Sequence, residues 1–332
     1  MRLTSRNFRQ VSTSEKAIGG YFELELSEPR EAMHQGAHRF QCARTAFLAV
    51  LSARAPRRVW LPFFICDSIV DQVQAAGLEC CFFPLNSRLG VAEDVAVAGD
   101  DILLYVNYFG ICNAEVAKVL RRFAPTQVVL DNSQSFYTPA ADCLATIYSP
   151  RKFFGVPDGG LLFSSLPVAS PREIDEGSEA RMRHLIKRLG GPPEVGYADY
   201  QSAEASLVGA PPRSMSALSA RLLSTVDFDA VRQRRRANFA LLHAALGDRN
   251  ELAIDADRID APLCYPFLSG DISYKKTLLA HRVFVPTYWP EVARRTGVPA
   301  FETRLVNSLH ALPCDQRYRQ DDMAKIIGLL TA

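Results

Sequence analysis

The stretch Ala145-Thr-Ile-Tyr-Ser-Pro-Arg-Lys-Phe-Phe-Gly-Val-Pro-Asp-Gly-Gly160 places Lys152 after a short apolar run and before two adjacent glycines. Upstream, Gln127-Val-Val-Leu-Asp-Asn-Ser-Gln134 places Asp131 directly after a second apolar run. A lysine amine can form an imine with an aldehyde, and a carboxylate can keep a pyridine nitrogen protonated. Pyridoxal phosphate (PLP) chemistry requires that pair of groups. Alone, the two residues would read as a loop lysine and a helix-capping aspartate, but together they predict a PLP site.

Short apolar runs alternate with helical patterns on both sides of this stretch. Strands are expected over 59–61, 79–85, 102–106, 127–130, 145–148 and 161–164, and helices over 40–53, 67–76 and 114–123. Continuous apolar strands separated by helices are typical of a mainly parallel sheet covered on both faces. The predicted fold class is therefore α/β, with a large sheet domain and a small α+β C-terminal domain.

Four polar or aromatic loops each follow one of the expected strands. They are 62–64, 107–110, 131–134 and 149–152. Because ligands of such sheets bind beyond the carboxyl ends of the strands, we expect these loops to share one edge and form one site.

The chain of 332 residues is long enough for two domains. We expect an N-terminal arm over 1–25, in which Gly19–Leu26 is a short strand or an extended arm, and a large domain over 26–213. Residues 166–213 are rich in Gly, Pro and Ser and predict a long surface excursion with a basic helix near 181–189. A small domain is expected over 214–332, with helices over 215–246 and 321–330.

The residues around Lys152 and Asp131 suit cofactor binding. Partial burial beside Phe153 and Phe154 would disfavour the charged form of Lys152 and ease imine formation. Asp131 would bind the ring nitrogen, and Gln134, three residues later, can reach the phenolic oxygen. The alternative for Asp131 and Gln134 is a helix cap followed by a polar helix residue.

The cofactor phosphate has two candidate ligand sets. Thr45 and the backbone amides of Arg44, Thr45 and Ala46 lie near an expected helix N-terminus, where free N–H groups favour an anion. Ser149 is a second candidate, although a turn-forming serine before Pro150 is an equal alternative.

Two further residues are candidates for contact with the ring or the substrate. Phe64 (or Phe63) can stack on the ring, although core packing is the alternative. Asn107 can contact cofactor or substrate, although Asn is also an ordinary turn residue.

Composition excludes several other classes of protein. A net charge of +2 argues against a nucleic-acid surface, and no apolar run reaches the ~18–20 residues of a membrane helix. The eight cysteines contain no Cys-x-x-Cys pair, which favours free thiols in a reducing cytosol, and the six histidines show no metal-ligand spacing. We expect a cytoplasmic protein with no metal site. No Gly-x-Gly-x-x-Gly follows the first strand, which argues against a nicotinamide-dependent Rossmann enzyme.

The two stretches resemble the DegT/DnrJ/StrS family of PLP-dependent nucleotide-sugar aminotransferases. In that family an acidic residue and two glycines follow the imine lysine, as Asp158-Gly159-Gly160 follow Lys152. Asp131-x-x-Gln134 matches the family's ring-nitrogen aspartate and its partner. Cys42–Phe47 lies where the family has its phosphate loop, and Pro62–Phe64 where it has its stacking aromatic. The family's Gly-Tyr-Asn segment, which reaches the neighbouring subunit, is absent.

The resemblance implies the type I aminotransferase fold, with a seven-stranded sheet, and a homodimeric enzyme. The implied reaction converts a keto sugar, expected to be nucleotide-linked, into an amino sugar with glutamate as the expected amino donor, in polysaccharide or glycosylated-metabolite synthesis. Lys152 would be both the imine lysine and the base that moves a proton. The alternatives are a catalytically silent or regulatory PLP-fold protein and a sugar dehydratase, although members with that activity replace the lysine.

Overall fold

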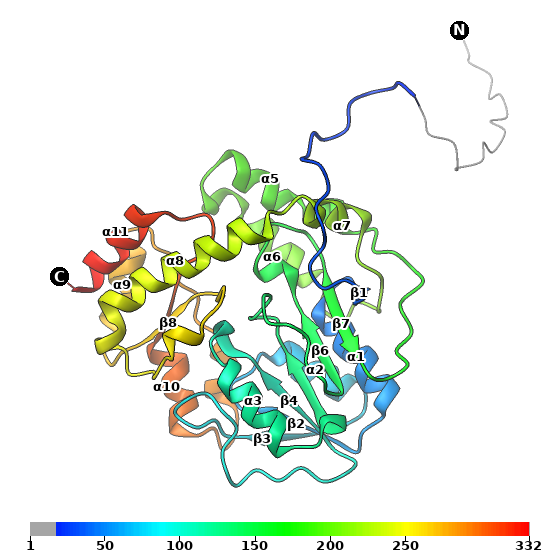
Figure 1. Ribbon diagram of the computed structural model, residues 1–332, viewed down its shortest axis with the longest axis vertical. Coiled ribbons are helices and arrows are strands. Elements are labelled where there is room, and N and C mark those ends of the chain that lie inside the picture. The colour runs from blue at the N-terminus through cyan, green and yellow to red at the C-terminus, as the bar shows by residue number, and fades with distance from the viewer. Residues whose placement is uncertain (1–17, 332) are drawn as a thin grey trace, which may run out of the picture.

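A seven-stranded sheet forms the centre of the computed structural model, which describes residues 18–331. Its strand order is β1-β7-β6-β5-β4-β2-β3, and Figure 1 shows the sheet between helices. Neighbouring strands from β2 to β6 are parallel, whereas β7 is antiparallel to both β6 and β1. The strands are β1 (His38–Phe40), β2 (Arg58–Pro62), β3 (Glu79–Phe83), β4 (Ile102–Val106), β5 (Val128–Asp131), β6 (Ala145–Tyr148) and β7 (Gly160–Ser164).

The buried apolar strands explain why this sheet could be predicted. All five residues of β4 are buried, as expected for a strand covered on both faces. The six predicted strands are confirmed to within two residues at each end. β1 was missed because three residues, two of them basic, carry no apolar run, and it forms only by pairing with β7.

Helices α1 (Ala43–Arg54) and α2 (Asp67–Ala75) pack against each other and the sheet, and α3 (Asn113–Arg122) packs against β5. All three were predicted. The remaining helices are α4 (Ser178–Arg181), α5 (Arg183–Gly190), α6 (Tyr197–Ala205), α7 (Ala217–Ser224), α8 (Phe228–Leu246), α9 (Ser273–Ala280), α10 (Ala300–Ser308) and α11 (Gln320–Thr331).

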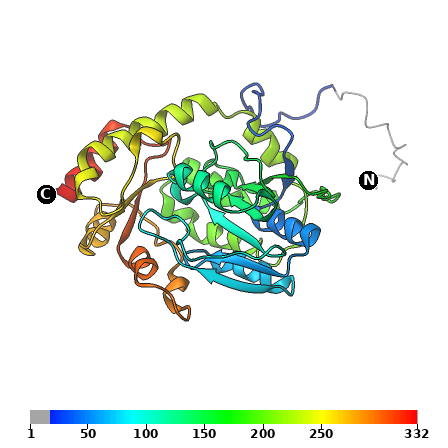
Figure 2. The same ribbon diagram turned by 60° about the horizontal axis from the view of Figure 1, so that its bottom comes forward.

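The C-terminal part is built on the long helix α8 and a two-stranded antiparallel sheet. That sheet consists of β8 (Tyr265–Leu268) and β9 (Leu309–Leu312). Figures 1 and 2 show α8 running from the sheet-bearing part toward α11. Phe239, Leu242 and Met323 belong to a core of their own, whereas Leu305 of α10 joins the main core. The predicted domain division after residue 213 therefore stays a prediction.

Residues 166–213 contain α4, α5 and α6, in agreement with the predicted basic helix near 181–189. At the other end of the chain, Gly19–Leu26 forms no strand. Tyr21 and Phe22 are almost fully exposed there, and Figure 1 shows this segment leading away from the body. The part of the predicted arm before residue 18 lies outside the described residues.

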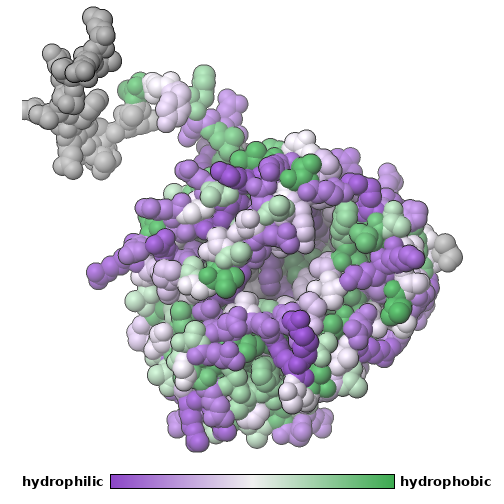
Figure 3. Space-filling model, turned by 180° about the vertical axis from the view of Figure 1, so that it is seen from behind, coloured by the Kyte–Doolittle hydropathy of each residue, from purple (hydrophilic) through white to green (hydrophobic). Residues whose placement is uncertain are grey.

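No helix within residues 18–331 is long and apolar enough to cross a membrane. Over the same range, no group of three or more His, Cys, Asp or Glu residues is placed to hold a metal ion. The eight cysteines are free thiols, five of them buried. Figure 3 shows polar and apolar side chains mixed over one face, which is hollowed near its centre.

Candidate functional site

The carboxyl ends of four adjacent strands meet at one edge of the sheet. β6, β5, β4 and β2 are neighbours and run parallel, so the loops that follow them lie next to one another. This confirms the predicted convergence of the loops 62–64, 107–110, 131–134 and 149–152. Edges of this kind are where α/β sheets bind ligands.

Asp131 is the last residue of β5, and its half-buried carboxylate faces this edge. Its Oδ1 accepts a hydrogen bond from the backbone N–H of Ser133 at 2.8 Å, and its carbonyl accepts one from the N–H of Asn107 at 3.0 Å. These contacts fix the loop after β5 to the loop after β4. Within residues 18–331 no cationic side chain binds this carboxylate, so its second oxygen is available to a ligand.

Lys152 ends a short 3-10 turn, Pro150–Lys152, that directly follows β6. Its side chain is exposed, so the expected partial burial is wrong. The reason is that Phe153 and Phe154 fill the buried positions of an aromatic cluster with Phe136, which leaves the lysine on the outer side of the turn. The amine is therefore accessible to a carbonyl compound.

Cys66, the N-cap residue of α2, follows β2 at the same edge of the sheet as Lys152 and Asp131. Burial raises the pKa of the Cys66 thiol, the positive charge of Lys152 opposes that rise, and the negative charge of Asp131 adds to it. Charges act on a group in this way only over short distances, because solvent and salt screen them further away. Both charges therefore contribute to the pKa of this thiol, in line with the position of Asp131 at the end of β5 and of the Lys152 turn after the adjacent strand β6.

Sequence reasoning missed Cys66. The aromatic residues Phe63 and Phe64 drew attention to the loop after β2, but the thiol whose pKa responds to Lys152 and Asp131 lies two residues after Phe64. The available signal was its position before Asp67, at the start of a predicted helix and within a converging loop.

Gln134 carries a buried hydrogen-bond donor without a partner. Its side chain is 1% exposed, and its Oε1 accepts a hydrogen bond from the N–H of Phe109 at 2.7 Å. Its Nε2 has no partner. An unpaired buried donor costs about 1–3 kcal/mol, so a ligand oxygen at this position would remove a penalty. This fits the predicted role toward a phenolic oxygen.

The backbone that holds Gln134 is tightly constrained. Phe109 has a φ of 55° and Gly110 a φ of 76°. A Cβ on Gly110 would lie 2.9 Å from the carbonyl oxygen of Gln134, so glycine is needed for this close approach.

The start of α1 lies against the Lys152 loop. Cys42, the N-cap residue, pairs with Gly159 in an isolated bridge, and a Cβ on Gly160 would lie 2.3 Å from the carbonyl carbon of Cys42. No side chain caps this N-terminus, which leaves the first-turn N–H groups for a ligand. The hydroxyl of Thr45 donates back to the carbonyl of Cys42 at 3.0 Å.

The remaining candidates differ in how free they are to bind a ligand. Ser149 is buried, and its hydroxyl makes no hydrogen bond to another residue of the described chain. Ala46 is fully buried and its N–H donates to the Cys42 carbonyl at 3.2 Å, so the predicted role of its amide toward a phosphate is wrong: the first helical hydrogen bond already uses it. Phe64 packs in the core on Tyr108, with ring centroids 5.8 Å apart. The Nδ2 of Asn107 donates to Asn113, and its Oδ1 accepts a hydrogen bond from the N–H of Cys112, so both ends of the amide are paired without a ligand. Ligand roles for Phe64 and Asn107 stay predictions.

Arg44 does not project freely from α1. Its guanidinium donates to Glu204 of α6 at 3.2 Å, and Arg151 pairs with the other oxygen of the same carboxylate. One carboxylate from the surface excursion therefore lies between two cations beside the start of α1.

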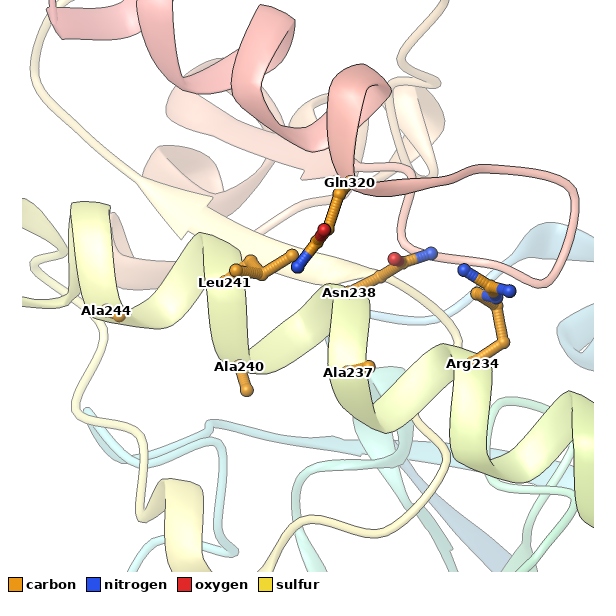
Figure 4. Close-up of a pocket in the computed structure, with 7 residues that line it drawn as sticks. All are labelled: Arg234, Ala237, Asn238, Ala240, Leu241, Ala244 and Gln320. Atoms are coloured by element: carbon orange, nitrogen blue, oxygen red, sulfur yellow. The ribbon is translucent and has the colours of Figure 1, made fainter.

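A shallow groove of about 360 Å³ lies elsewhere, between α8 and α11 (Figure 4). None of the predicted site residues lines it. Its lining residues are Arg234, Ala237, Asn238, Ala240, Leu241, Ala244 and Gln320. It is therefore separate from the edge that carries Lys152.

No protein-family model matches the sequence, and no curated protein matches it either. Solved structures do match. The sugar aminotransferase CalS13 from Micromonospora echinospora has a TM-score of 0.63 and 19% identity, over 89% of this chain and 86% of CalS13. A DegT DnrJ EryC1 StrS aminotransferase from Brucella abortus has a TM-score of 0.62 and 16% identity, over 89% and 85%. DesI, solved in the presence of its TDP-sugar product, has a TM-score of 0.61 and 20% identity, over 89% and 79%. The predicted aminotransferase fold is confirmed.

Proposed function

We propose that this protein is a PLP-dependent aminotransferase that converts a keto sugar into an amino sugar. The observation that carries the proposal is that Asp131 ends β5, the Lys152 turn follows the adjacent parallel strand β6, and the unpaired Nε2 of Gln134 lies at the same sheet edge, within an aminotransferase fold. A lysine amine and a carboxylate at one site are the pair that PLP requires.

The residues of this edge fit the cofactor. Asp131 would hold the ring nitrogen, and the unpaired Nε2 of Gln134 would donate to the phenolic oxygen. The uncapped first turn of α1, with Thr45, and the hydroxyl of Ser149 would hold the phosphate. When bound, PLP supplies an aldehyde for covalent attachment and a ring that accepts electrons from the substrate carbon.

Lys152 has two tasks in this proposal. Its exposed Nζ is the amine that the aldehyde can reach, and once released it is the base that takes a proton from the substrate carbon and returns it. Asp131 keeps the ring nitrogen protonated. Gln134, whose Oε1 is fixed by the Phe109 N–H, would orient the ring through a hydrogen bond from its unpaired Nε2.

The sugar substrate rests on the similar structures. CalS13 is a sugar aminotransferase, and DesI was solved with a TDP-sugar product. We propose a nucleotide-linked keto sugar as the acceptor and glutamate as the donor. A panel of nucleotide-linked and free keto sugars, assayed with glutamate and by mass spectrometry for the amino product, tests both parts.

We also propose a homodimer. Helix α5 has no buried residue in the described chain, and its Leu189 is 91% exposed. A second copy that covers such apolar side chains would lower the free energy of the assembly. Light scattering during gel filtration should give twice the chain mass of 36.8 kDa. A single-chain mass at micromolar concentration would contradict the dimer.

The test of the main proposal uses absorbance and chemical trapping. Purified protein with PLP should develop a visible band, borohydride should fix a pyridoxyl label on Lys152, and glutamate should remove the band. Lys152→Ala should abolish the band and the label, whereas Lys276→Ala, which removes an exposed lysine of α9, should leave both unchanged. Retention of the band by Lys152→Ala would refute the site. A band that glutamate does not remove would favour the silent PLP-fold protein.

A further inference from the structure

Arg235, in α8, is a buried cation outside the residues assigned to the site. It is 2% exposed, and burial lowers the pKa of its guanidinium. No ion pair of Arg235 occurs in the described part of the chain; the neighbouring carboxylate of Asp315 binds Arg317 instead. Buried arginines are usually paired with a carboxylate, because desolvation of an unpaired charge is costly. The desolvation free energy of the unpaired Arg235 guanidinium therefore indicates that this side chain has a specific role.

The guanidinium of Arg235 holds the residue that follows Lys152. Its carbon lies 4.5 Å from the ring centroid of Phe153, and its Nη2 donates to the Phe153 carbonyl at 3.3 Å. The side chain of Gln316 donates to the same carbonyl at 2.7 Å. Two donors from separate segments of the C-terminal part therefore fix the peptide unit between Phe153 and Phe154, one residue beyond the lysine.

The other side of the guanidinium reaches the segment that supports Gln134. Nη1 donates to the carbonyls of Pro262 and Leu263, at 2.9 and 3.2 Å. The N–H of Leu263 donates in turn to the Phe109 carbonyl at 2.8 Å, and the N–H of Phe109 donates to Gln134. A continuous set of hydrogen bonds thus connects Arg235 to the loops that carry both Lys152 and Gln134.

We infer that Arg235 is a positioning residue for Lys152, an inference that rests on the proposed function. The lysine is exposed and sits on a turn of three residues, so few contacts of its own fix it. Its upstream side continues from β6, and its downstream side is held at the Phe153 carbonyl. A planar guanidinium group can stack on the Phe153 ring and donate to three carbonyls at the same time. A lysine ammonium cannot stack in this way.

The experiment uses two measurements on the full-length protein. The first is the rate at which borohydride traps the pyridoxyl label on Lys152 after PLP is added. The second is amide hydrogen exchange of peptides covering 149–156, without cofactor. Arg235→Met should slow the labelling and speed the exchange, each at least about tenfold. Arg235→Lys should recover part of both effects, and Gln316→Leu should show the same two effects more weakly.

Two control variants separate positioning from general stability. Arg236→Met removes an exposed arginine from the same helix and should behave as wild type. Leu242→Ala removes a fully buried side chain of α8 from the C-terminal core and should lower the melting temperature without changing either measurement.

Three outcomes decide the matter. Wild-type rates of labelling and exchange in Arg235→Met would overturn the inference. So would a Leu242→Ala variant that is as stable as Arg235→Met and shows the same change in both rates. Failure of the wild-type protein to label at Lys152 would instead refute the proposed function, and the positioning role would fall with it.

Discussion

At the scale of single residues, the candidate site depends on the charges that lie at the strand ends. Asp131 ends β5 and Lys152 lies in the turn after the neighbouring strand β6, and both charges contribute to the pKa of the thiol of Cys66, which follows β2. The thiol of Cys66 is thus a built-in reporter of both charges, in the absence of any cofactor.

This reporter gives a test of pH dependence. Lys152→Ala removes the cation that favours the Cys66 thiolate, so the pKa of Cys66 should rise and its alkylation should begin at higher pH. Asp131→Asn removes the anion that disfavours the thiolate, so the pKa should fall and alkylation should begin at lower pH. Mass spectrometry of the Cys66 peptide after timed iodoacetamide treatment across pH measures both shifts.

Cys80 provides the internal reference for this measurement. Burial and Cys81 raise the pKa of the Cys80 thiol and Arg295 opposes them, with no contribution from Lys152 or Asp131. Its profile should therefore stay unchanged in both variants. Shifts of Cys66 in one common direction would show that the two charges do not face the same sulfur.

The sequence predicted the pair Lys152 and Asp131 but not its surroundings. Both residues follow apolar runs and stand in motifs with fixed spacing, and their catalytic roles stay predictions. The exposure of Lys152 could not be found, because it depends on which side of a three-residue turn Phe153 and Phe154 occupy. The engagement of Arg44 with Glu204 joins residues 160 positions apart, which no local pattern encodes.

At the scale of elements, the contact between the segment after the Lys152 loop and the start of α1 leaves the least space of any in the candidate site. Gly160 begins β7 and packs directly on the backbone of Cys42, the N-cap of α1. This contact sets where the first turn of α1 lies relative to the lysine.

Gly160→Ala should therefore disrupt both stability and cofactor binding. Its Cβ would lie 2.3 Å from the Cys42 carbonyl carbon, and backbone cannot give way as a flexible side chain can. Overpacking of this kind costs about 1–3 kcal/mol, measurable by urea unfolding, and PLP affinity should fall because α1 is displaced. Gly155→Ala is the control, since the nearest atom to its Cβ is a methyl of Leu185 at 3.8 Å. Equal stability of the two variants would contradict the close contact.

Elements with strong apolar patterns were predictable, and elements that form through pairing were not. β4 and α3 were found because their patterns are continuous. The antiparallel direction of β7 was not predicted, because the apolar run Leu161–Ser164 does not show in which direction the strand runs. Only the pairing of β7 with β6 and β1 shows that direction.

At the scale of the whole molecule, three parts of the chain meet around the candidate site. The sheet supplies the loops, α8 and the segment near Gln316 hold the turn after Lys152, and the excursion 166–213 reaches the start of α1 through Glu204. The excursion was predicted as a surface segment, and its contact with the site came only from the structure.

The position of Glu204 predicts that the excursion opposes anion binding. Its carboxylate is paired with Arg44 and Arg151, next to the uncapped start of α1 where a phosphate would bind. A phosphate must compete with this carboxylate, because both are anions attracted to the same two guanidinium groups. Glu204→Gln keeps the shape of the side chain and removes its charge, so PLP and inorganic phosphate should both bind more tightly. A partly exposed pair is worth about 0.2–1 kcal/mol, so the expected gain in dissociation constant lies between about 1.4-fold and fivefold.

Absorbance titration with PLP, and competition by inorganic phosphate, measure this gain. Glu194→Gln is the matched control, because Glu194 lies in the same excursion but pairs with the exposed Arg282. It should leave both dissociation constants unchanged. Weaker phosphate binding in Glu204→Gln would mean that the carboxylate instead holds the two arginines in place for the ligand. In that case the loss of the carboxylate would free both guanidinium groups and still weaken binding. Helix α6, which carries Glu204, would then be one of the elements that build the phosphate site.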